Sequence, residues 1–171
     1  MEEGVYYVAE RKPLVKLSKR FTGPYLTTLH KGTHMTLKIA INGFGRIGRA
    51  VGRIAAKDPN IDLVAINDLT SPELLAHLFK YDTVHGRYDG EVSVEGNKII
   101  IDGDVIEISS ERDPANLKWG EKGVDYVLEC TGFFRKRADA AKHLEAGAKK
   151  VLISAPGKGV DMTVVMGVNH E

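Results

Sequence analysis

Three glycines at a fixed spacing occur in the stretch Gly43-Phe44-Gly45-Arg46-Ile47-Gly48, which is the part of the sequence best suited to bind a ligand. A G-x-G-x-x-G stretch between a strand and a helix is typical of proteins that bind the pyrophosphate of a dinucleotide. The first glycine permits the tight turn, the second lets the backbone approach the phosphates, and the third allows close packing of helix on strand. The helix N-terminus then supplies N–H groups and a partial positive charge. The alternative interpretation is a glycine-rich turn without a ligand.

An acidic residue, Asp68, ends the next predicted strand, 20 residues after Gly48. A dinucleotide-binding sequence has an acid at about this distance, and its carboxylate accepts hydrogen bonds from the ribose hydroxyls. A 2′-phosphate in the same place would be repelled, so Asp68 favours NAD over NADP. The alternative is a loop aspartate that caps the turn before Leu69-Thr70-Ser71.

The elements that must position these residues follow an alternating order from Met35 onward. Apolar runs predict strands, and apolar residues at helical spacing predict helices. Ser71-Pro72-Glu73 is a good helix start, with an N-cap serine and a proline in the first turn. The predicted strands are 37–41, 61–66, 124–128 and 150–154, and the predicted helices are 46–57, one that starts near Ser71, and 136–145. This order predicts an α/β fold of the Rossmann type, with a doubly wound parallel sheet.

The middle of the chain has a different pattern. Runs at 91–94, 98–101 and 105–108 are separated by Glu95-Gly96-Asn97 and Asp102-Gly103-Asp104. Short apolar runs joined by glycine-containing turns predict antiparallel hairpins. We therefore expect a hairpin region inserted in the parallel fold.

Residues 1–34 differ from the rest in charge, because they carry a net charge of +3 whereas the remainder carries −2. They include a β-like run, Val5-Tyr6-Tyr7-Val8, and Gly32-Thr33-His34-Met35 has the look of a cloning junction. We interpret 1–34 as a leader or extension, either appended or native, and 35–171 as the NAD-binding domain. The fold prediction rests on the second segment alone.

Composition excludes several classes of protein. The net charge of +1 is not that of a typical nucleic-acid-binding domain, and no apolar run is long enough for a transmembrane helix or a secretory signal. The single cysteine, Cys130, excludes an intrachain disulfide framework, and no cysteine cluster suggests zinc. We expect a cytoplasmic protein with no metal site and no nucleic-acid or membrane partner.

Blocks spread along the chain resemble phosphorylating glyceraldehyde-3-phosphate dehydrogenase, in particular its bacterial form. They occur in the family order from about Leu37 to the last residue, and together they are highly specific. The blocks are Ala40-Ile41-Asn42-Gly43-Phe44-Gly45-Arg46-Ile47-Gly48-Arg49, Ala65-Ile66-Asn67-Asp68, Lys80-Tyr81-Asp82-Thr83-Val84-His85-Gly86, Glu111-Arg112-Asp113-Pro114, Glu129-Cys130-Thr131-Gly132-Phe133-Phe134, Ile153-Ser154-Ala155-Pro156 and Met166-Gly167-Val168-Asn169-His170-Glu171.

The resemblance implies that NAD is the cofactor and that several residues bind it. Arg46 and Ile47 would lie against the pyrophosphate, and Asp68 would bind the adenine ribose. Arg112 would lie beside the adenine, although a surface ion pair with a neighbouring acid is an alternative. The full set of implied cofactor-binding residues is Asn42, Gly43, Gly45, Arg46, Ile47, Gly48, Asp68, Arg112, Thr131 and Ser154.

The resemblance also implies a reaction in which a cysteine thiolate attacks an aldehyde, hydride passes to NAD, and phosphate releases the acyl group. The family's nucleophile lies in a Ser-x-Ala-Ser-Cys-Thr-Thr-Asn-type segment, which these 171 residues do not contain. Cys130 does not match it, and we interpret that residue as a small buried apolar one. We interpret His85 as a loop residue and His143 as part of one helix face. No catalytic residue is therefore predicted here, and we expect these residues to be inactive alone.

Three wider expectations follow from the resemblance. The parent enzyme would be a homotetramer. The chain could alternatively be a non-catalytic NAD-binding module or a subunit of a split enzyme. A sister enzyme that acts on erythrose 4-phosphate would have a very similar cofactor half.

Overall fold

A nine-stranded sheet runs through the whole molecule in the order β11-β1-β10-β9-β2-β3-β8-β7-β6. The computed structural model describes residues 4–9 and 36–170. Neighbouring strands are parallel from β11 to β8, whereas β8-β7 and β7-β6 are antiparallel. The strands are β1 (Gly4–Ala9), β2 (Leu37–Asn42), β3 (Ile61–Asn67), β6 (Val92–Glu95), β7 (Lys98–Ile101), β8 (Asp104–Ser109), β9 (Tyr126–Glu129), β10 (Lys150–Ile153) and β11 (Met162–Val165).

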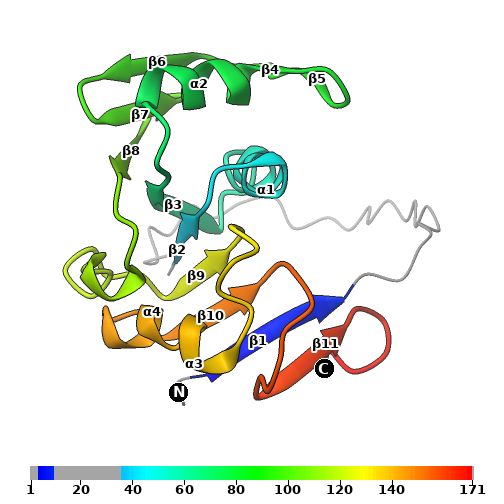
Figure 1. Ribbon diagram of the computed structural model, residues 1–171. Helices are drawn as coiled ribbons and strands as arrows, with labels where there is room; N and C mark the ends of the chain where they lie inside the picture. The colour runs from blue at the N-terminus through cyan, green and yellow to red at the C-terminus, as the bar shows by residue number, and fades with distance from the viewer. Residues whose placement is uncertain (1–3, 10–35, 171) are drawn as a thin grey trace, which may run out of the picture.

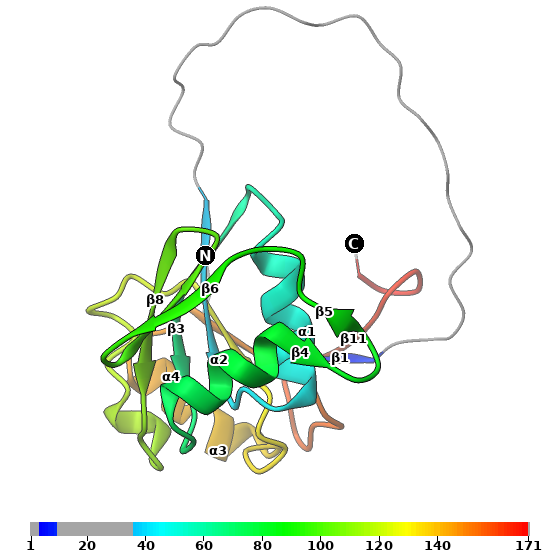
Figure 2. The same ribbon diagram turned by 90° about the horizontal axis from the view of Figure 1, so that it is seen from above.

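Helices cover both faces of this sheet, which confirms the predicted doubly wound α/β architecture (Figure 1). Helices α1 (Arg46–Ala55) and α2 (Pro72–Lys80) lie next to each other on one face (Figures 1 and 2). Helices α3 (Arg137–Ala140) and α4 (Lys142–Glu145) cover β9 and β10 on the other face, near a short helical turn, η1 (Pro114–Asn116). A separate pair of very short strands, β4 (Tyr81–Asp82) and β5 (Gly86–Arg87), follows α2.

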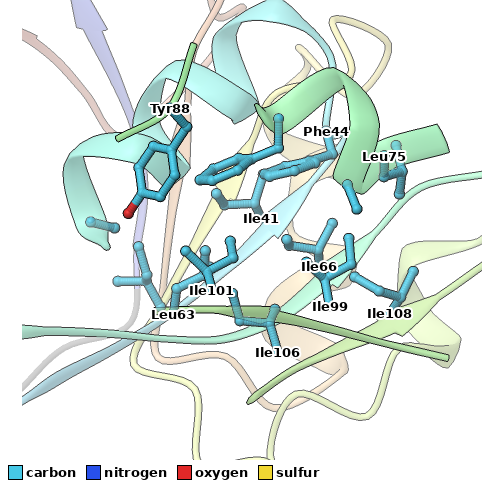
Figure 3. Close-up of a cluster of buried hydrophobic side chains, with 14 residues drawn as sticks. Ile41, Phe44, Leu63, Ile66, Leu75, Tyr88, Ile99, Ile101, Ile106 and Ile108 are labelled. Atoms are coloured by element: carbon cyan, nitrogen blue, oxygen red, sulfur yellow. The ribbon is translucent and has the colours of Figure 1, made fainter. Parts of the chain in front are cut away.

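The largest core cluster lies between the sheet and helices α1 and α2 (Figure 3). Ile39 and Ile41 of β2 belong to this cluster, whereas Ala40 belongs to the cluster on the opposite face. All are buried, because a parallel strand covered on both faces is apolar on both. The rings of Phe44 and Phe79 stack here with centroids 5.8 Å apart, which fixes α2 against the start of α1.

The hairpin region is present and extends the main sheet. Strands β6, β7 and β8 form the two predicted antiparallel pairs, and β8 continues as a parallel neighbour of β3. Ile99, Ile101 and Ile106 from this region are buried in the large core cluster. The insertion therefore shares its core with the parallel fold.

Two details differ from the sequence prediction. The helix expected at 136–145 is divided at Ala141 into α3 and α4. Strand β11 was not predicted, and its short sequence Met162-Thr163-Val164-Val165 contains one polar residue.

The first segment of the chain also differs from expectation, because residues 4–9 form β1 inside the sheet. Strand β1 lies between β10 and β11 and is parallel to both. Val5 is fully buried, and its N–H donates to Asp161 Oδ2 at 2.9 Å. The interpretation of all of residues 1–34 as a leader or extension therefore disagrees with the structure at β1. That interpretation used the different net charge of the segment, but a buried valine and pairing between two strands place β1 in the sheet. The Gly32-Thr33-His34-Met35 junction lies outside the described residues.

Candidate dinucleotide-binding site

A cleft with a volume of about 480 Å³ lies at the carboxyl ends of β2, β3 and β9. The chain leaves β2 toward β3 on one side, while β9 adjoins β2 on the other. Open α/β sheets bind ligands at such a switch point in strand order. The cleft is lined by Asn42, Gly43, Gly45, Asn67, Asp68, Leu69, Glu111, Arg112, Cys130, Thr131, Phe133 and Phe134.

Each glycine of the G-x-G-x-x-G stretch has its own steric reason. Gly43 has φ of +90°, and a Cβ there would lie 2.7 Å from the backbone nitrogen of Thr131. At Gly48 a Cβ would meet the carbonyl oxygen of Gly43 at 2.3 Å, so the helix could not approach the strand. A Cβ on Gly45 would have no atom within 4 Å, and this glycine faces open space beside the cleft.

Helix α1 begins at this open position. Gly45 is its N-cap in an extended conformation, with no side chain capping the helix and no acidic residue in the first turn. The first N–H groups of a helix have no partner within the helix, and the positive end of the helix dipole favours an anion there. Arg46 and Ile47 are exposed in the same turn. The loop and helix therefore form a cradle that fits a pyrophosphate.

Asp68 follows β3 and is tied to the glycine loop. Its Oδ2 accepts a hydrogen bond from the N–H of Phe44 at 2.7 Å, and its Oδ1 accepts from the N–H of Thr70 at 2.9 Å. The sequence assigned this carboxylate to a ribose. In the structure, the same carboxylate also holds the backbone between the first two glycines. It caps the turn that follows β3 as well, which was the alternative role given to Asp68 in the sequence analysis.

The predicted site residues divide into two groups. The structure places Asn42, Gly43, Gly45, Asp68, Arg112 and Thr131 in the lining of the cleft. Arg46, Ile47 and Gly48 lie in the adjoining first turn of α1. Ser154, at the exposed end of β10, is near Cys130 and outside the lining. Arg112 is exposed, and no ion pair to Glu111 or Asp113 joins it among the described residues.

Asn42 contributes its backbone to the cleft, because its side chain is committed to neighbouring strands. The side chain is buried, with Nδ2 donating to Glu129 Oε2 at 2.6 Å and Oδ1 accepting from Asn67 Nδ2 at 2.8 Å. Asn67 Oδ1 in turn accepts from the N–H of Glu111 at 2.8 Å and from the hydroxyl of Ser109 at 3.0 Å. A line of hydrogen bonds thus crosses the ends of β9, β2, β3 and β8 beneath the cleft.

Sequence reasoning missed two buried members of this line, Glu129 and His143, which are 1% and 0% exposed. His143 Nε2 lies 3.0 Å from Glu129 Oε2, and Trp119 Nε1 donates to His143 Nδ1 at 3.0 Å. Glu129 Oε1 accepts from the N–H of Thr131 at 2.8 Å and also from its hydroxyl. An ionisable residue directly after the apolar run of β9 was the available signal for Glu129. The interpretation of His143 as part of a helix face omitted these contacts.

Aromatic and aliphatic side chains that the sequence analysis did not select also line the cleft. Leu69 and Phe133 are largely exposed, at 55% and 84%, and Phe134 lies beside them in the lining. Exposed apolar surface at the edge of a polar cleft is suited to the flat face of a base.

Cys130 lines the cleft without the properties of a nucleophile. Burial raises the pKa of its thiol from 9.0 to about 11, and the nearby Glu129 carboxylate also raises it. Reactive cysteines instead have lowered pKa values, because the thiolate is the attacking species. Within 4–9 and 36–170, no group of three His, Cys, Asp or Glu side chains could hold a metal ion, and no helix is long and apolar enough to cross a membrane.

A glycine loop, an acid after the second strand of the parallel unit, and a cleft at the switch point define a Rossmann-type dinucleotide-binding domain. A family model for the glyceraldehyde 3-phosphate dehydrogenase NAD binding domain matches residues 37–137. The chain belongs to this family, and the domain is an NAD-binding one of an oxidoreductase type.

Curated relatives agree with the family match. The chain is similar to glyceraldehyde-3-phosphate dehydrogenase 1 of Bacillus subtilis (strain 168), with 61% identity over 137 residues, 80% of this chain and 41% of the relative. It is 64% identical over 137 residues to the glyceraldehyde-3-phosphate dehydrogenase of Priestia megaterium, with the same coverage. With that of Thermotoga maritima, identity is 54% over 136 residues, 78% of this chain and 41% of the relative. The chain thus spans about two-fifths of the length of these relatives.

Proposed function

We propose that the cleft is the cofactor platform of an enzyme that oxidises glyceraldehyde 3-phosphate, couples the oxidation to phosphorylation, and transfers hydride to NAD. The observation that carries this proposal is the cradle itself, in which Gly45 and the N-terminus of α1 face open space beside Asp68. Family membership and the relatives' names support the reaction.

The residues of this chain bind and orient the cofactor. The first turn of α1, with Arg46 and Ile47, would lie against the pyrophosphate, and Asp68 would accept hydrogen bonds from the adenine ribose. Arg112 would lie beside the adenine, Thr131 would form a wall of the groove, and Ser154 would approach the nicotinamide end. NAD, when bound, supplies the hydride acceptor for the reaction.

In this proposal, the nucleophile of the reaction is a thiolate that does not belong to the 171 residues of this sequence. Cys130 is the single cysteine of the sequence, and burial raises its pKa to about 11. A nucleophile that remains protonated at neutral pH reacts slowly, so we propose that these residues bind NAD without turnover. A second polypeptide segment that carries an activated cysteine would complete the enzyme.

The direct test is calorimetry of the purified chain with NAD and with NADP, followed by an absorbance assay for reduced cofactor with glyceraldehyde 3-phosphate and phosphate. We expect NAD to bind more tightly than NADP and no reduced cofactor to form. Failure of both cofactors to bind contradicts the platform. Turnover that disappears in Cys130→Ser would instead make Cys130 the nucleophile.

Two broader proposals rest on the family alone. We propose that the parent enzyme assembles as a homotetramer and that it works in the cytoplasm. Sedimentation of the parent enzyme and fractionation of its cells test these two points.

A further inference from the structure

The hydrogen bonds around His143 fix which of its ring nitrogens carries the proton. The indole Nε1 of Trp119 can only donate, and it lies 3.0 Å from His143 Nδ1. Nδ1 must therefore accept, so it carries no proton. A neutral imidazole then has its hydrogen on Nε2, which lies 3.0 Å from Glu129 Oε2 and donates to it. A charged imidazolium would place an N–H against the indole N–H.

The same logic applies to Glu129, on which donors converge. Oε2 faces Nε2 of His143 and Nδ2 of Asn42, and Oε1 faces the N–H and hydroxyl of Thr131. An ionised carboxylate only accepts hydrogen bonds, which fits the N–H groups of His143, Asn42 and Thr131 that face its two oxygens. The buried side chain of Glu129 is thus held by donors from β2, α4 and the loop after β9.

Both oxygens of Glu129 fix parts of the cleft wall. Oε1 holds Thr131, against which Gly43 packs so closely that a Cβ on Gly43 would lie 2.7 Å from the Thr131 nitrogen. Oε2 holds Asn42, the residue before Gly43, and Asn42 holds Asn67, the residue before Asp68. The positions of the first glycine and of the acid therefore both depend on one carboxylate.

We propose that Glu129 and His143 are positioning residues of the NAD cleft, which set the spacing of Thr131, Gly43 and Asp68 through hydrogen bonds beneath the site. This inference rests on the proposed NAD platform. A cleft that is already in its binding arrangement binds more tightly, because the ordering cost is not incurred on binding. A fully satisfied buried network also excludes alternative arrangements of its members.

The tautomer of His143 gives a spectroscopic test on the unmodified chain. We expect the nitrogen chemical shifts of its ring at neutral pH to show an unprotonated Nδ1 and a protonated Nε2. The described groups that face His143 are the carboxyl group of Glu129, the amide of Asn42, the indole of Trp119 and the ring of Phe134. A doubly protonated ring, or a proton on Nδ1, overturns the proposal.

The binding test uses Glu129→Gln, which keeps the shape and replaces an acceptor oxygen by an NH₂ group that faces donors. We expect calorimetry to show NAD binding at least about tenfold weaker at a temperature where the variant is folded. Two controls isolate the cause. Glu145→Gln makes the same chemical change at an exposed position of α4. Ile99→Val removes a methylene group from the large core cluster and so lowers stability without touching the hydrogen bonds of Glu129. Both should bind NAD as the unmodified chain does.

The outcomes separate the two proposals. No NAD binding by the unmodified chain contradicts the platform, whereas equal binding by Glu129→Gln and the unmodified chain contradicts the positioning role. Loss of NAD binding in Ile99→Val as well would show that lowered stability alone is sufficient to abolish NAD binding. This result also contradicts the positioning role. Trp119→Phe serves where Glu129→Gln does not fold, because removing the indole donor should change the chemical shift of His143 Nδ1. Unchanged shifts in that variant overturn the proposal.

Discussion

The carboxylate of Asp68 and the N–H of Phe44 are joined by a hydrogen bond of 2.7 Å, which couples the acid after β3 to the turn that carries the glycines. The second oxygen of Asp68 accepts from Thr70 at 2.9 Å. Asp68 therefore organises the backbone of the cleft and also places a carboxylate in its lining. Replacements at this position separate the two contributions.

Replacing Asp68 by asparagine should narrow the preference for NAD over NADP by roughly tenfold, about 1.4 kcal/mol. The neutral amide removes the repulsion of a 2′-phosphate and can still accept the Phe44 hydrogen bond. Asp68→Ala should narrow the preference as well, but with weaker binding of both cofactors. Calorimetry with each cofactor measures these affinities. Asp62→Asn, near the other end of β3, is the matched control, and equal affinity of the unmodified chain for both cofactors contradicts the assignment.

Alanine at the first two glycines should have opposite effects. Gly45→Ala should leave the melting temperature nearly unchanged, since its Cβ meets nothing within 4 Å, but should weaken NAD binding about tenfold or more. Gly43→Ala should lower stability by about 1–3 kcal/mol or more, because φ is +90° and the Cβ collides with Thr131. Thermal unfolding and calorimetry on both variants test this. Unweakened NAD binding in a folded Gly45→Ala would show that the pyrophosphate lies elsewhere.

Truncating Val5 should destabilise the protein, in contrast to the sequence-based interpretation of residues 1–34 as a leader or extension outside the fold. Val5 is fully buried in strand β1, so Val5→Ala should lower the free energy of unfolding by about 1–3 kcal/mol. Val105→Ala, at a position 52% exposed, should cost far less. Urea unfolding measures both. Identical stability of Val5→Ala and the unmodified chain would show that β1 does not belong to the sheet.

Cys130 should react slowly with iodoacetamide at neutral pH in the folded protein and rapidly in urea. Its pKa is raised to about 11, so the folded state holds the thiol proton that the unfolded state releases near 9.0. The folded state therefore binds more protons in this interval, and stability falls as pH rises from about 9 to 11, by up to roughly 1.4 kcal/mol per pH unit.

Cys130→Ala should lack this part of the alkaline destabilisation, and the difference between the two unfolding curves measures it. Mass spectrometry follows the alkylation, and bound NAD should slow it further because Cys130 lines the cleft. Rapid alkylation of the folded chain at pH 7 is the result that would refute a buried, protonated thiol.

Local patterns were sufficient to predict most of the fold. The apolar runs of β2, β3 and β10, the start of α2 at Ser71, and the hairpin turns all express preferences that act within a few residues. Strand β11 and the packing of β1 depend on partners far away in the chain. Val5 is buried in a core cluster with Ala140, Val151 and Ile153, all of which are more than 130 positions away in the chain.

The part of the site that depends on residue spacing in the sequence could be predicted. The part that depends on side chains from distant segments meeting in the folded protein could not. The spacing of Gly43, Gly48 and Asp68 is a property of the sequence. The meeting of Glu129 with Asn42 follows from the register of β2 with β9, in which these two residues are partners. A helix pattern cannot show that His143 accepts a hydrogen bond from an indole, because that contact joins α4 to the segment after η1, 24 positions earlier in the chain.

The place of β1 in the sheet has a consequence for how the chain acquires its structure. Among the described residues, β1 pairs with β10 and β11, and the hydrogen bond between Val5 and Asp161 joins residues 156 positions apart. Contacts at such separation form slowly, because a long loop must close before they contribute any free energy. During synthesis the edge of β1 that β11 covers in the folded sheet would stay unpaired until β11 emerges, so at this edge an unfinished chain is exposed to wrong pairing with another strand.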